Sequence, residues 1–399
     1  MRLLRYPAFL SVSLSHLGVD VLNGQVGVLL AALSLTLGLS NAQIGLIATA
    51  YAILGSLTQP FFGWLSDRDG GRWTLAGGVL WMAAFFGLLA LAPAGWALPF
   101  MLLGSLGSGA FHPPGTARAA QVGALGLAGQ AATAASIFFL FGQVGLSAGP
   151  AVGGFLLEHV GRPGLFGPAA LTFLLGLFTF WALPAGAGSP SRPAATGAHP
   201  AGARPLVVPA LGLLVLILVI SGLRVWAQSV ITTFGPKFLQ DLGLTSSEYG
   251  AVVGVFMAGT AIGGVLGSSL ADRWSYPRTI LLSQLLSLAP FVLFPLVRGP
   301  WLYLLAALAG LFNGGPHSIL VTMAQRTLPG RAGFASGLIL GLTFALGALG
   351  TSFTGWLADR TGLALALQLN AALAGLAALL SLGLVLRRSP APAPAPTGD

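Results

Sequence analysis

Between two long apolar runs lies the stretch Gly63-Trp64-Leu65-Ser66-Asp67-Arg68-Asp69-Gly70-Gly71-Arg72, a short polar loop in a chain of 399 residues. Weaker copies follow three later apolar runs, at Gly154-Phe155-Leu156-Leu157-Glu158-His159-Val160-Gly161-Arg162, Leu270-Ala271-Asp272-Arg273 and Gly355-Trp356-Leu357-Ala358-Asp359-Arg360-Thr361-Gly362. With Ser268 aligned to Gly63, the first and third copies lie 205 residues apart, and the second and fourth lie 201 apart. The chain is therefore interpreted as two halves, each a doubled unit of three helices.

The composition shows what surrounds these repeated units. Hydrophobic residues make up 55% of the chain and charged residues 7%, and the mean hydropathy is +0.87. Apolar runs of about twenty residues follow one another, each long enough to cross the hydrocarbon layer of a bilayer. In lipid, every spanning backbone group has to be satisfied within a helix. We therefore expect an all-α membrane protein with twelve transmembrane helices in two pseudo-symmetric six-helix bundles.

The apolar runs set the expected limits of spans and domains. The predicted spans are 7–35, 43–65, 73–92, 96–117, 131–157, 164–184, 206–233, 247–270, 278–296, 300–325, 332–357 and 363–386. The predicted domains are an N-terminal bundle at 1–184, a cytoplasmic linker at 185–205, a C-terminal bundle at 206–388 and a disordered tail at 389–399. The linker is rich in proline, glycine and alanine, a composition typical of flexible connections.

Basic residues are unevenly distributed around the expected spans. The formal net charge is +9, with 18 lysines and arginines. Thirteen of them fall on the side that both termini share: Arg2, Arg5, Arg68, Arg72, Arg118, Arg192, Arg204, Arg273, Arg278, Arg326, Arg331, Arg387 and Arg388. Only Arg162, Lys237, Arg298 and Arg360 fall on the other side, and Arg224 lies within the seventh span. Because basic loops stay in the cytoplasm, we expect both termini there, in a bacterial inner (plasma) membrane.

Several function classes are disfavoured by composition. No basic stripe or aromatic platform accompanies the positive charge, so we expect no nucleic-acid partner. The chain has no cysteine, which excludes disulfides, thiolate catalysis and cysteine zinc sites. It also lacks a His-Glu-x-x-His sequence, so we expect no enzymatic activity and no resident metal or other cofactor. The expected partners are lipid, protons and a small-molecule substrate, and we expect a monomer.

The loop motif at residues 63–72 and the two-half organisation resemble the major facilitator superfamily over the whole chain. The resemblance rests on residues of the motif: Gly63, Leu65, Asp67, Arg68, Gly70 and Arg72. The third copy is weaker, with Ser268 and Ser275 at its glycine positions. In the superfamily this loop is a conformational latch between the halves. Locally, Gly63 allows helix ends to approach, Gly70 turns the chain, and Asp67 can pair with an arginine or a helix N-terminus. The alternative is a simple tight turn.

A second signature lies in the fifth span, at Gly145-Leu146-Ser147-Ala148-Gly149-Pro150-Ala151-Val152-Gly153-Gly154. Small residues four apart let helices pack backbone to backbone, and Pro150 is expected to kink the helix. Glycine pairs of this kind are common in membrane helices. The complete string, which includes Gly145, Gly149, Gly153 and Gly154, resembles the antiporter motif of drug exporters in the superfamily. The resemblance favours export by exchange over uptake.

Further strings resemble the fosmidomycin-resistance branch of these exporters over most of the chain. They are Ser13-Leu14-Ser15-His16-Leu17 with Asp20, Gln59-Pro60, Phe111-His112-Pro113, Leu328-Pro329-Gly330-Arg331 and Ser336-Gly337-Leu338. Members of this branch can carry a carboxylate directly after the His-Pro pair. Here that position is Pro114, which argues against a proton-carrying acid in the fourth span.

The superfamily resemblance implies that spans 1, 4, 7 and 10 line a central cavity, and the unusual polar residues fall on these four spans. On the first span, His16, Asp20 and Asn23 have i, i+4, i+7 spacing and form one stripe. His112 and His317 lie 205 residues apart, the duplication offset itself, while Asp20 and Arg224 lie 204 apart. We assign proton coupling to Asp20 and His16. The predicted substrate-binding residues are Asn23, His112, Arg224, Gln228, Asn313 and His317.

An acid inside a membrane is costly and marks an ion or substrate path by default. The hypothesis is proton-coupled alternating access, in which Asp20 takes up a proton from outside and releases it inside, and Arg224 or a charged substrate controls whether the proton stays. Four structural alternatives remain. Asp20 could only tie helices together, His112 could cap a carbonyl at a helix break, His317 could serve packing, and Arg224 could snorkel to the external interface.

Other transport functions remain open at this point. The sequence favours a proton-coupled exporter of a small drug-like or anionic organic molecule, driven by the proton gradient. An uptake symporter or facilitator of a small organic solute is one alternative, and a metal-ion exporter that uses His16 and Asp20 as i, i+4 ligands is another. An arginine and histidines favour an anionic substrate, whereas Asp20 and aromatic side chains allow a lipophilic cation.

Overall fold

The computed structural model describes residues 3–69, 71–126, 131–183, 208–327 and 332–386. Within these ranges every regular element is a helix, and no strand occurs. The expected all-α class is therefore confirmed. The predicted linker and tail lie outside the described residues, as do Gly70 and the stretch Leu328-Pro329-Gly330-Arg331, while Ser336-Gly337-Leu338 is described only as helix.

Helices of the first half follow the predicted spans within a few residues, the fourth ending later. They are η1 (Leu3–Arg5), α1 (Pro7–Gly24), α2 (Val26–Leu37), α3 (Asn41–Leu57), α4 (Gln59–Asp69), α5 (Arg72–Leu91), α6 (Ala94–Gly126), α7 (Ala131–His159), η2 (Arg162–Leu165) and α8 (Phe166–Ala182). Those of the second half are α9 (Val208–Asp241), α10 (Ser246–Arg273), α11 (Tyr276–Leu293), η3 (Phe294–Leu296), α12 (Pro300–Gly314), α13 (His317–Thr327), α14 (Ala332–Thr361) and α15 (Leu363–Leu386).

The same capping box begins one helix in each half. At α3 the Ser40 hydroxyl accepts a hydrogen bond from the Gln43 N–H (3.2 Å), and the Gln43 side chain accepts one from the Ser40 N–H (2.9 Å). Thr245 and Glu248 repeat this arrangement at α10, at 3.3 and 2.8 Å. The two boxes lie 205 residues apart. The duplication therefore extends to local hydrogen bonds that fix where helices begin.

Three predicted spans each contain one irregular turn that divides the helix into two labelled segments. The first is divided at Gln25 into α1 and α2, the second at Thr58 into α3 and α4, and the tenth at Gly315-Pro316 into α12 and α13. Conversely, the alternative that expects a helix break at Phe111-His112-Pro113 is wrong, because α6 continues through Pro113 and Pro114 to Gly126. Gly109 is the residue whose carbonyl Pro113 deprives of its helical partner. Helix α3 lies close beside this residue, since a Cβ on Gly109 would lie 2.7 Å from Gly55 O.

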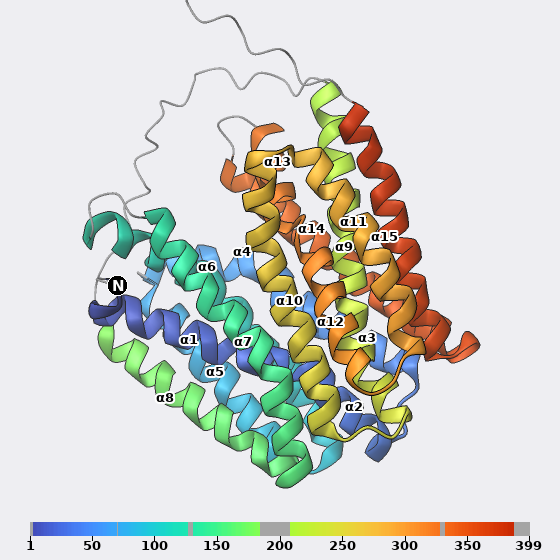
Figure 1. Ribbon diagram of the computed structural model, residues 1–399. Coiled ribbons are helices and arrows are strands. Elements are labelled where there is room, and N and C mark those ends of the chain that lie inside the picture. The colour runs from blue at the N-terminus through green and yellow to red at the C-terminus, as the bar shows by residue number, and fades with distance from the viewer. Residues whose placement is uncertain (1–2, 70, 127–130, 184–207, 328–331, 387–399) are drawn as a thin grey trace, which may run out of the picture.

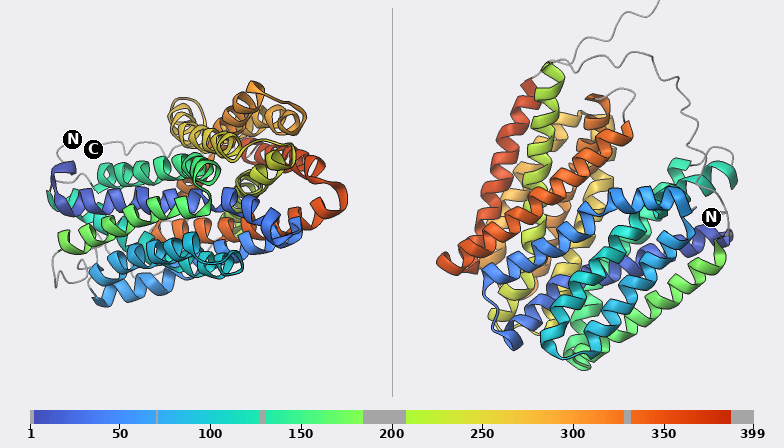
Figure 2. Two further views of the ribbon diagram at one scale, coloured as in Figure 1. Left: turned by 90° about the horizontal axis from the view of Figure 1, so that it is seen from below. Right: turned by 180° about the vertical axis from the view of Figure 1, so that it is seen from behind.

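The two halves form two bundles that meet at one end and diverge toward the other (Figures 1 and 2). Helices α1 to α8 form the first bundle and α9 to α15 the second. Across the junction α7 packs along α10, α3 along α14, and α2 against α9. We call the end that carries the α2–α3 and α9–α10 connections the joined end, and the opposite end the divergent end.

Glycines bring the two bundles close together near the joined end. A Cβ on Gly45 would lie 2.9 Å from Thr351 O, and one on Gly254 would lie 2.7 Å from Ser147 O. Real Cβ atoms essentially never approach that closely. The backbones of α3 and α14, and of α7 and α10, are therefore in contact in the manner of small-residue membrane interfaces.

Many outward-facing residues are large and apolar, while polar residues are concentrated inside. Trp181, Leu379 and Val265 are exposed, whereas Asp20 and Arg224 are buried. In the described part of the chain, eleven helical stretches are long and apolar enough to cross a membrane. Such an inverted distribution, apolar outside and polar inside, is expected where lipid is the solvent.

Candidate functional site

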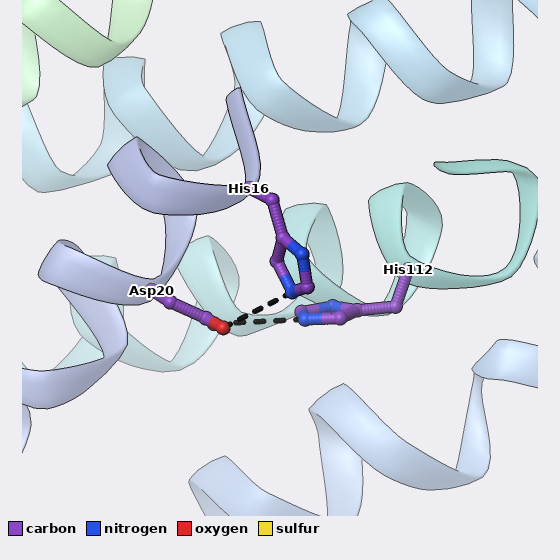
Figure 3. Close-up of side chains that lie close together, drawn as sticks. All are labelled: His16, Asp20 and His112. Carbon is purple, nitrogen blue, oxygen red and sulfur yellow. Dashed lines mark ion pairs between the residues drawn. The ribbon is translucent and has the colours of Figure 1, made fainter. Parts of the chain in front are cut away.

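Three ionisable side chains meet inside the first bundle, as Figure 3 shows. Nε2 of His16 lies 3.2 Å from one carboxylate oxygen of Asp20, and Nε2 of His112 lies 3.5 Å from the other. Asp20 is 5% exposed. The His112 side chain is 24% exposed, more than either partner, and forms the accessible side of the group. The i, i+4 pair on α1 therefore meets α6 at one buried carboxylate.

The other ring nitrogen of each histidine fixes its tautomer. Nδ1 of His16 lies 2.8 Å from Phe138 O, and Nδ1 of His112 lies 2.8 Å from Ser108 O. A carbonyl oxygen can only accept a hydrogen bond, so both Nδ1 atoms carry the proton. Both Nε2 atoms consequently point at the carboxylate with a lone pair, unless a further proton is present. The carbonyl that His112 contacts belongs to Ser108, one turn back in the unbroken helix, and it is not a carbonyl freed by Pro113 or Pro114.

Tyr51 and Ser108, which the sequence did not predict as site residues, extend this group through Asn23. Asn23 donates hydrogen bonds to Asp20 (2.9 Å) and to the Ser108 hydroxyl (3.1 Å), and the Tyr51 hydroxyl donates to Asn23 (2.6 Å). We call the set His16, Asp20, Asn23, Tyr51, Ser108 and His112 the acid cluster. Tyr51 and Ser108 belong to residue types that are ordinary in membrane helices, so no sequence signal distinguishes them.

Gly142 was also missed, although it closes the acid cluster on the α7 side. A Cβ there would lie 2.7 Å from a carboxylate oxygen of Asp20, and closer still to His16 Nε2. The antiporter motif continues along the same face of α7. Gly145 contacts Leu17 and Asp20, and Gly149 contacts Gly24, all on α1. Glycine at these positions lets α7 lie directly against the helix that carries the acid.

The end of the antiporter motif packs in two directions. A Cβ on Gly153 would lie 2.8 Å from Gln25, at the interruption between α1 and α2. Gly154 instead faces the other bundle, where its Cβ would lie 3.2 Å from Gly250 Cα. Pro150 lies inside α7 without ending the helix. The motif thus joins the acid-bearing helix of one bundle to α10 of the other.

The second bundle holds a corresponding group around a buried arginine. Arg224 donates to the Gln228 side chain (3.1 Å) and to Asn313 O (3.4 Å), and it lies 3.1 Å from Nδ1 of His317. We call these four residues the arginine cluster. Arg224 is 3% exposed, so it does not snorkel to an interface. Among the described residues, neither its Nε nor Oδ1 of Asn313 has a hydrogen-bond partner.

The predicted residues thus gather into two groups within separate bundles. The expected pseudo-symmetric correspondence is present, because Asp20 meets His112 as Arg224 meets His317, and the two histidines lie 205 residues apart. Asp20 and Arg224 form no direct ion pair, since none of the ion pairs between described residues joins them. The bundles diverge in this structure, so each charge is held by partners of its own bundle.

The contacts that Arg68 and Arg72 of the loop motif make with Trp64 and Phe180 lie within the first bundle. Arg68 stacks over the Trp64 ring (3.6 Å to its centroid), while Arg72 donates to Phe180 O (2.9 Å) and lies over the Phe180 ring. The left-handed turn is made by Gly71 (φ 80°), next to Gly70, which lies outside the described residues. Gly63 makes only an ordinary contact with Pro113, and Asp67 begins the last turn of α4.

The acid cluster also has the composition of a metal site. His16, Asp20 and His112 each offer a ligand atom, and these atoms lie within 4.8 Å of one another. Histidine ligands usually donate their second ring N–H to a carbonyl or carboxylate, as both histidines do here. Chemically, the group can therefore hold either protons or a transition-metal ion.

Comparison with known proteins agrees with the repeat and the fold. The family model described as Major Facilitator Superfamily matches residues 8–240 and again 214–399. The fosmidomycin resistance protein of Escherichia coli (strain K12) is 28% identical over 371 residues, which cover 90% of this chain and 88% of that protein. The uncharacterized MFS-type transporter YfnC of Bacillus subtilis (strain 168) is 29% identical, with coverage of 90% and 88%. The resemblance to the superfamily and to its fosmidomycin-resistance branch is confirmed.

Solved structures share the fold at low sequence identity. A bacterial homolog of the human lysosomal transporter Spinster, in an inward-facing and occupied conformation, matches with a TM-score of 0.77 at 17% identity, covering 96% of this chain and 98% of that one. The nucleoside transporter NupG matches with a TM-score of 0.75 at 16% identity, covering 96% and 100%. By its sequence, its two-bundle fold and its relatives, this multi-pass membrane protein belongs to the major facilitator superfamily.

Proposed function

We propose that this transporter exports a small drug-like or anionic organic molecule in exchange for protons, with the acid cluster as the proton site and the arginine cluster as the substrate anchor. The observation that carries the proposal is the pair of histidines whose Nε2 atoms both point at Asp20. The proton gradient supplies the energy, and no cofactor takes part.

The acid cluster is suited to bind and release protons. With both Nδ1 atoms committed to carbonyl oxygens, each Nε2···carboxylate contact needs one more proton to be attractive. The Asp20 carboxylate already accepts a hydrogen bond from Asn23 (2.9 Å), which favours its ionised form. A mobile proton would then reside between the acid and a histidine. The His112 side chain is 24% exposed, so that a proton can reach and leave the acid cluster through this residue.

The arginine cluster is suited to bind an anion. Arg224 is buried, and no acid among the described residues pairs with it. A buried charge without a counter-ion is costly, and the free Nε of Arg224 can donate a further hydrogen bond. A carboxylate, phosphate or phosphonate group of a substrate would meet both requirements. Gln228, Asn313 and His317 would complete the polar wall.

The two clusters lie in bundles that move relative to one another in alternating access. In the proposed cycle, protons enter the acid cluster from outside, and they leave to the cytoplasm when the cavity faces inward. An anionic substrate bound at Arg224 neutralises the charge of the arginine cluster, and it is released when the cavity faces outward. Proton and substrate therefore occupy the carrier alternately, and net exchange follows.

Two considerations support export over uptake. The Escherichia coli relative is named for resistance to fosmidomycin, and removal from the cell is one way to resist a compound. The Gly145 to Gly154 string resembles the antiporter motif. The alternative, uptake symport or facilitated diffusion of a small organic solute, uses the same clusters with the opposite direction of net flow.

Membrane orientation forms part of the proposal. We infer that α14, which is 30 residues long, is a twelfth span, and that both termini are cytoplasmic. In the described residues, Arg68, Arg72 and Arg273 lie at the divergent end. That end would then face the cytoplasm by the positive-inside rule, and the structure would be inward-facing. We expect a monomer in a bacterial inner membrane.

The test is proton-driven transport in proteoliposomes, with substrates chosen from a drug-susceptibility panel on an efflux-deficient host. We expect substrate to accumulate in an acidic lumen and accumulation to stop with a protonophore. Asp20→Asn should lose at least about 100-fold of this rate, the scale of a lost proton-transfer group. Asp241→Asn, which removes an exposed acid paired with Lys237 on the same helix, should keep it. Undiminished proton-driven export by Asp20→Asn would refute the proposal.

A metal-ion exporter is the second candidate, favoured by the grouping of His16, Asp20 and His112. Two nitrogens and one carboxylate suit a transition-metal ion. Zinc, cobalt and nickel ions should then raise the melting temperature of the purified protein, and Asp20→Asn should abolish that rise. Proton-driven metal movement in the same proteoliposomes would place this function ahead of the first.

A further inference from the structure

We propose that Glu158 and Asp359 form two latches that hold the bundles together at the joined end. These residues are the acids of the second and fourth copies of the loop motif. The inference goes beyond the proposed function, because it depends only on the two-bundle fold and on neither protons nor substrate.

The first latch crosses from the second bundle to the first. Asp359, near the end of α14, accepts hydrogen bonds from the backbone N–H groups of Asn41 (2.8 Å) and Ala42 (2.9 Å). These are the first two residues of α3. Each carboxylate oxygen thus accepts one N–H, and the negative charge sits at the positive end of the helix macrodipole.

The second latch crosses in the opposite direction. Glu158, near the end of α7 in the first bundle, accepts a hydrogen bond from the Ser247 N–H (2.9 Å) at the start of α10. Ser247 and Ala42 lie 205 residues apart, so both latches use the same position of the repeated helix. The two contacts are related by the internal duplication and share no residue.

The capping boxes explain why these positions need a partner from outside. The first N–H groups of a helix have no acceptor within it. At α3 the box satisfies the N–H groups of Ser40 and Gln43, and at α10 those of Thr245 and Glu248. Between them, the N–H groups of Asn41 and Ala42 at α3 and that of Ser247 at α10 donate to the acid of the opposite bundle. Separation of the bundles at this end would break these hydrogen bonds.

The neighbouring basic residues are turned away from the latches. Arg360 stacks over Trp356 (3.9 Å to the ring centroid) and donates to Trp356 O, while His159 stacks on Phe155 (4.3 Å between centroids). Each basic side chain is thus held by its own helix, four residues back. The adjacent acid, Asp359 or Glu158, instead contacts the opposite bundle.

Both acids are exposed, so water and salt reach the latches. Contacts of this kind are weak enough to open during a transport cycle. A charge at a helix terminus changes an equilibrium by about two- to fivefold at low salt. Effects at sites that share no partner multiply, so the two latches together should favour the joined state by about tenfold.

Distances between spin labels can test this, because the chain contains no cysteine of its own. One label pair, Val160→Cys with Leu365→Cys, reports on the joined end, and another, Trp181→Cys with Leu386→Cys, reports on the divergent end. All four side chains are exposed. In this background, Glu158→Gln and Asp359→Asn should each raise the ratio of separated to joined molecules about threefold, and the double variant about tenfold.

Two controls make the result specific. Asp241→Asn removes an acid at the joined end that forms an ion pair with Lys237 of the same helix, α9, and it should leave the ratio unchanged. About 1 M salt should shift the parent toward the separated state but not the double variant, because only the parent has latches to screen. A double variant with the parental ratio, a parent that ignores salt, or an equal shift in Asp241→Asn would overturn the proposal. None of these readouts involves transport, so the proposed function can fail independently.

Discussion

The acid cluster and the arginine cluster each place a buried charge beside a histidine, but the charges have opposite sign. In the first bundle His112 points its Nε2 at the carboxylate of Asp20, and in the second His317 lies with Nδ1 against the guanidinium of Arg224. Arginine only donates, so Nδ1 of His317 must be an unprotonated acceptor. A histidine beside an acid can share a proton, whereas one beside an arginine is kept neutral. After duplication, a change of charge at one position would therefore leave proton exchange in the first bundle and anion binding in the second.

The most direct way to break this comparison is to change the two histidines in parallel. His112→Gln should reduce proton-driven export about 100-fold and flatten its pH profile, since a proton carrier is lost. His317→Gln should change it no more than about threefold, because glutamine can still accept from Arg224. Transport rates between pH 5 and 8 measure both. Equal losses would mean that the clusters do not differ in function.

A charge-preserving change sharpens the role of the second cluster. Arg224→Lys should raise KM for anionic substrates about tenfold, because an ammonium cannot reproduce the planar fork that contacts Gln228, Asn313 and His317. The pH profile should keep its shape. Kinetics with an anionic and a neutral substrate separate the effects. A variant that transports both substrates normally would argue against an anion anchor at Arg224.

Gly142→Ala tests how closely α7 must approach the acid. The added Cβ would lie 2.7 Å from Asp20, so the acid and His16 have to move apart. Proton-driven export should fall about fivefold, as misplaced catalytic groups lose rate, with substrate KM unaltered. Gly77→Ala in α5, where a Cβ meets nothing within 4 Å, is the matched control. If both alanines behave alike, the packing of α7 has no bearing on the acid.

The smallest effect is expected at the edge of the acid cluster. Tyr51→Phe removes a hydrogen bond to Asn23 and leaves the ring in place. Such a bond contributes about 1 kcal/mol, so the melting temperature should fall by a few degrees and export by about threefold. Thermal denaturation in detergent, followed by intrinsic fluorescence, measures the first. An unchanged melting temperature would show that Asn23 is held without it.

Much of this arrangement follows from sequence. Helical spacing puts His16 and Asp20 on one face, and the duplication offset pairs His112 with His317. The sequence did not predict Tyr51 and Gly142 as site residues, because their roles depend on how helices far apart in sequence are rotated against one another. The interruption at Gln25 has no proline or glycine at that residue to mark it. The 204-residue offset between Asp20 and Arg224 does not say whether the two side chains pair directly, because that depends on the relation between the bundles; the ion pairs of the described residues do not join them.

The first span contains an irregular turn at Gln25, and this turn has a mechanical consequence. Asp20 lies on α1, which packs within its own bundle, whereas α2 packs against α9 of the other, with Gly27 close to Thr232. The joint between them is Gln25, whose buried amide lacks a hydrogen-bond partner among the described residues. Any movement of α1 with its bundle relative to α2 with the other bundle would therefore have to be taken up at Gln25. Stiffening that joint should slow turnover while leaving both binding steps intact.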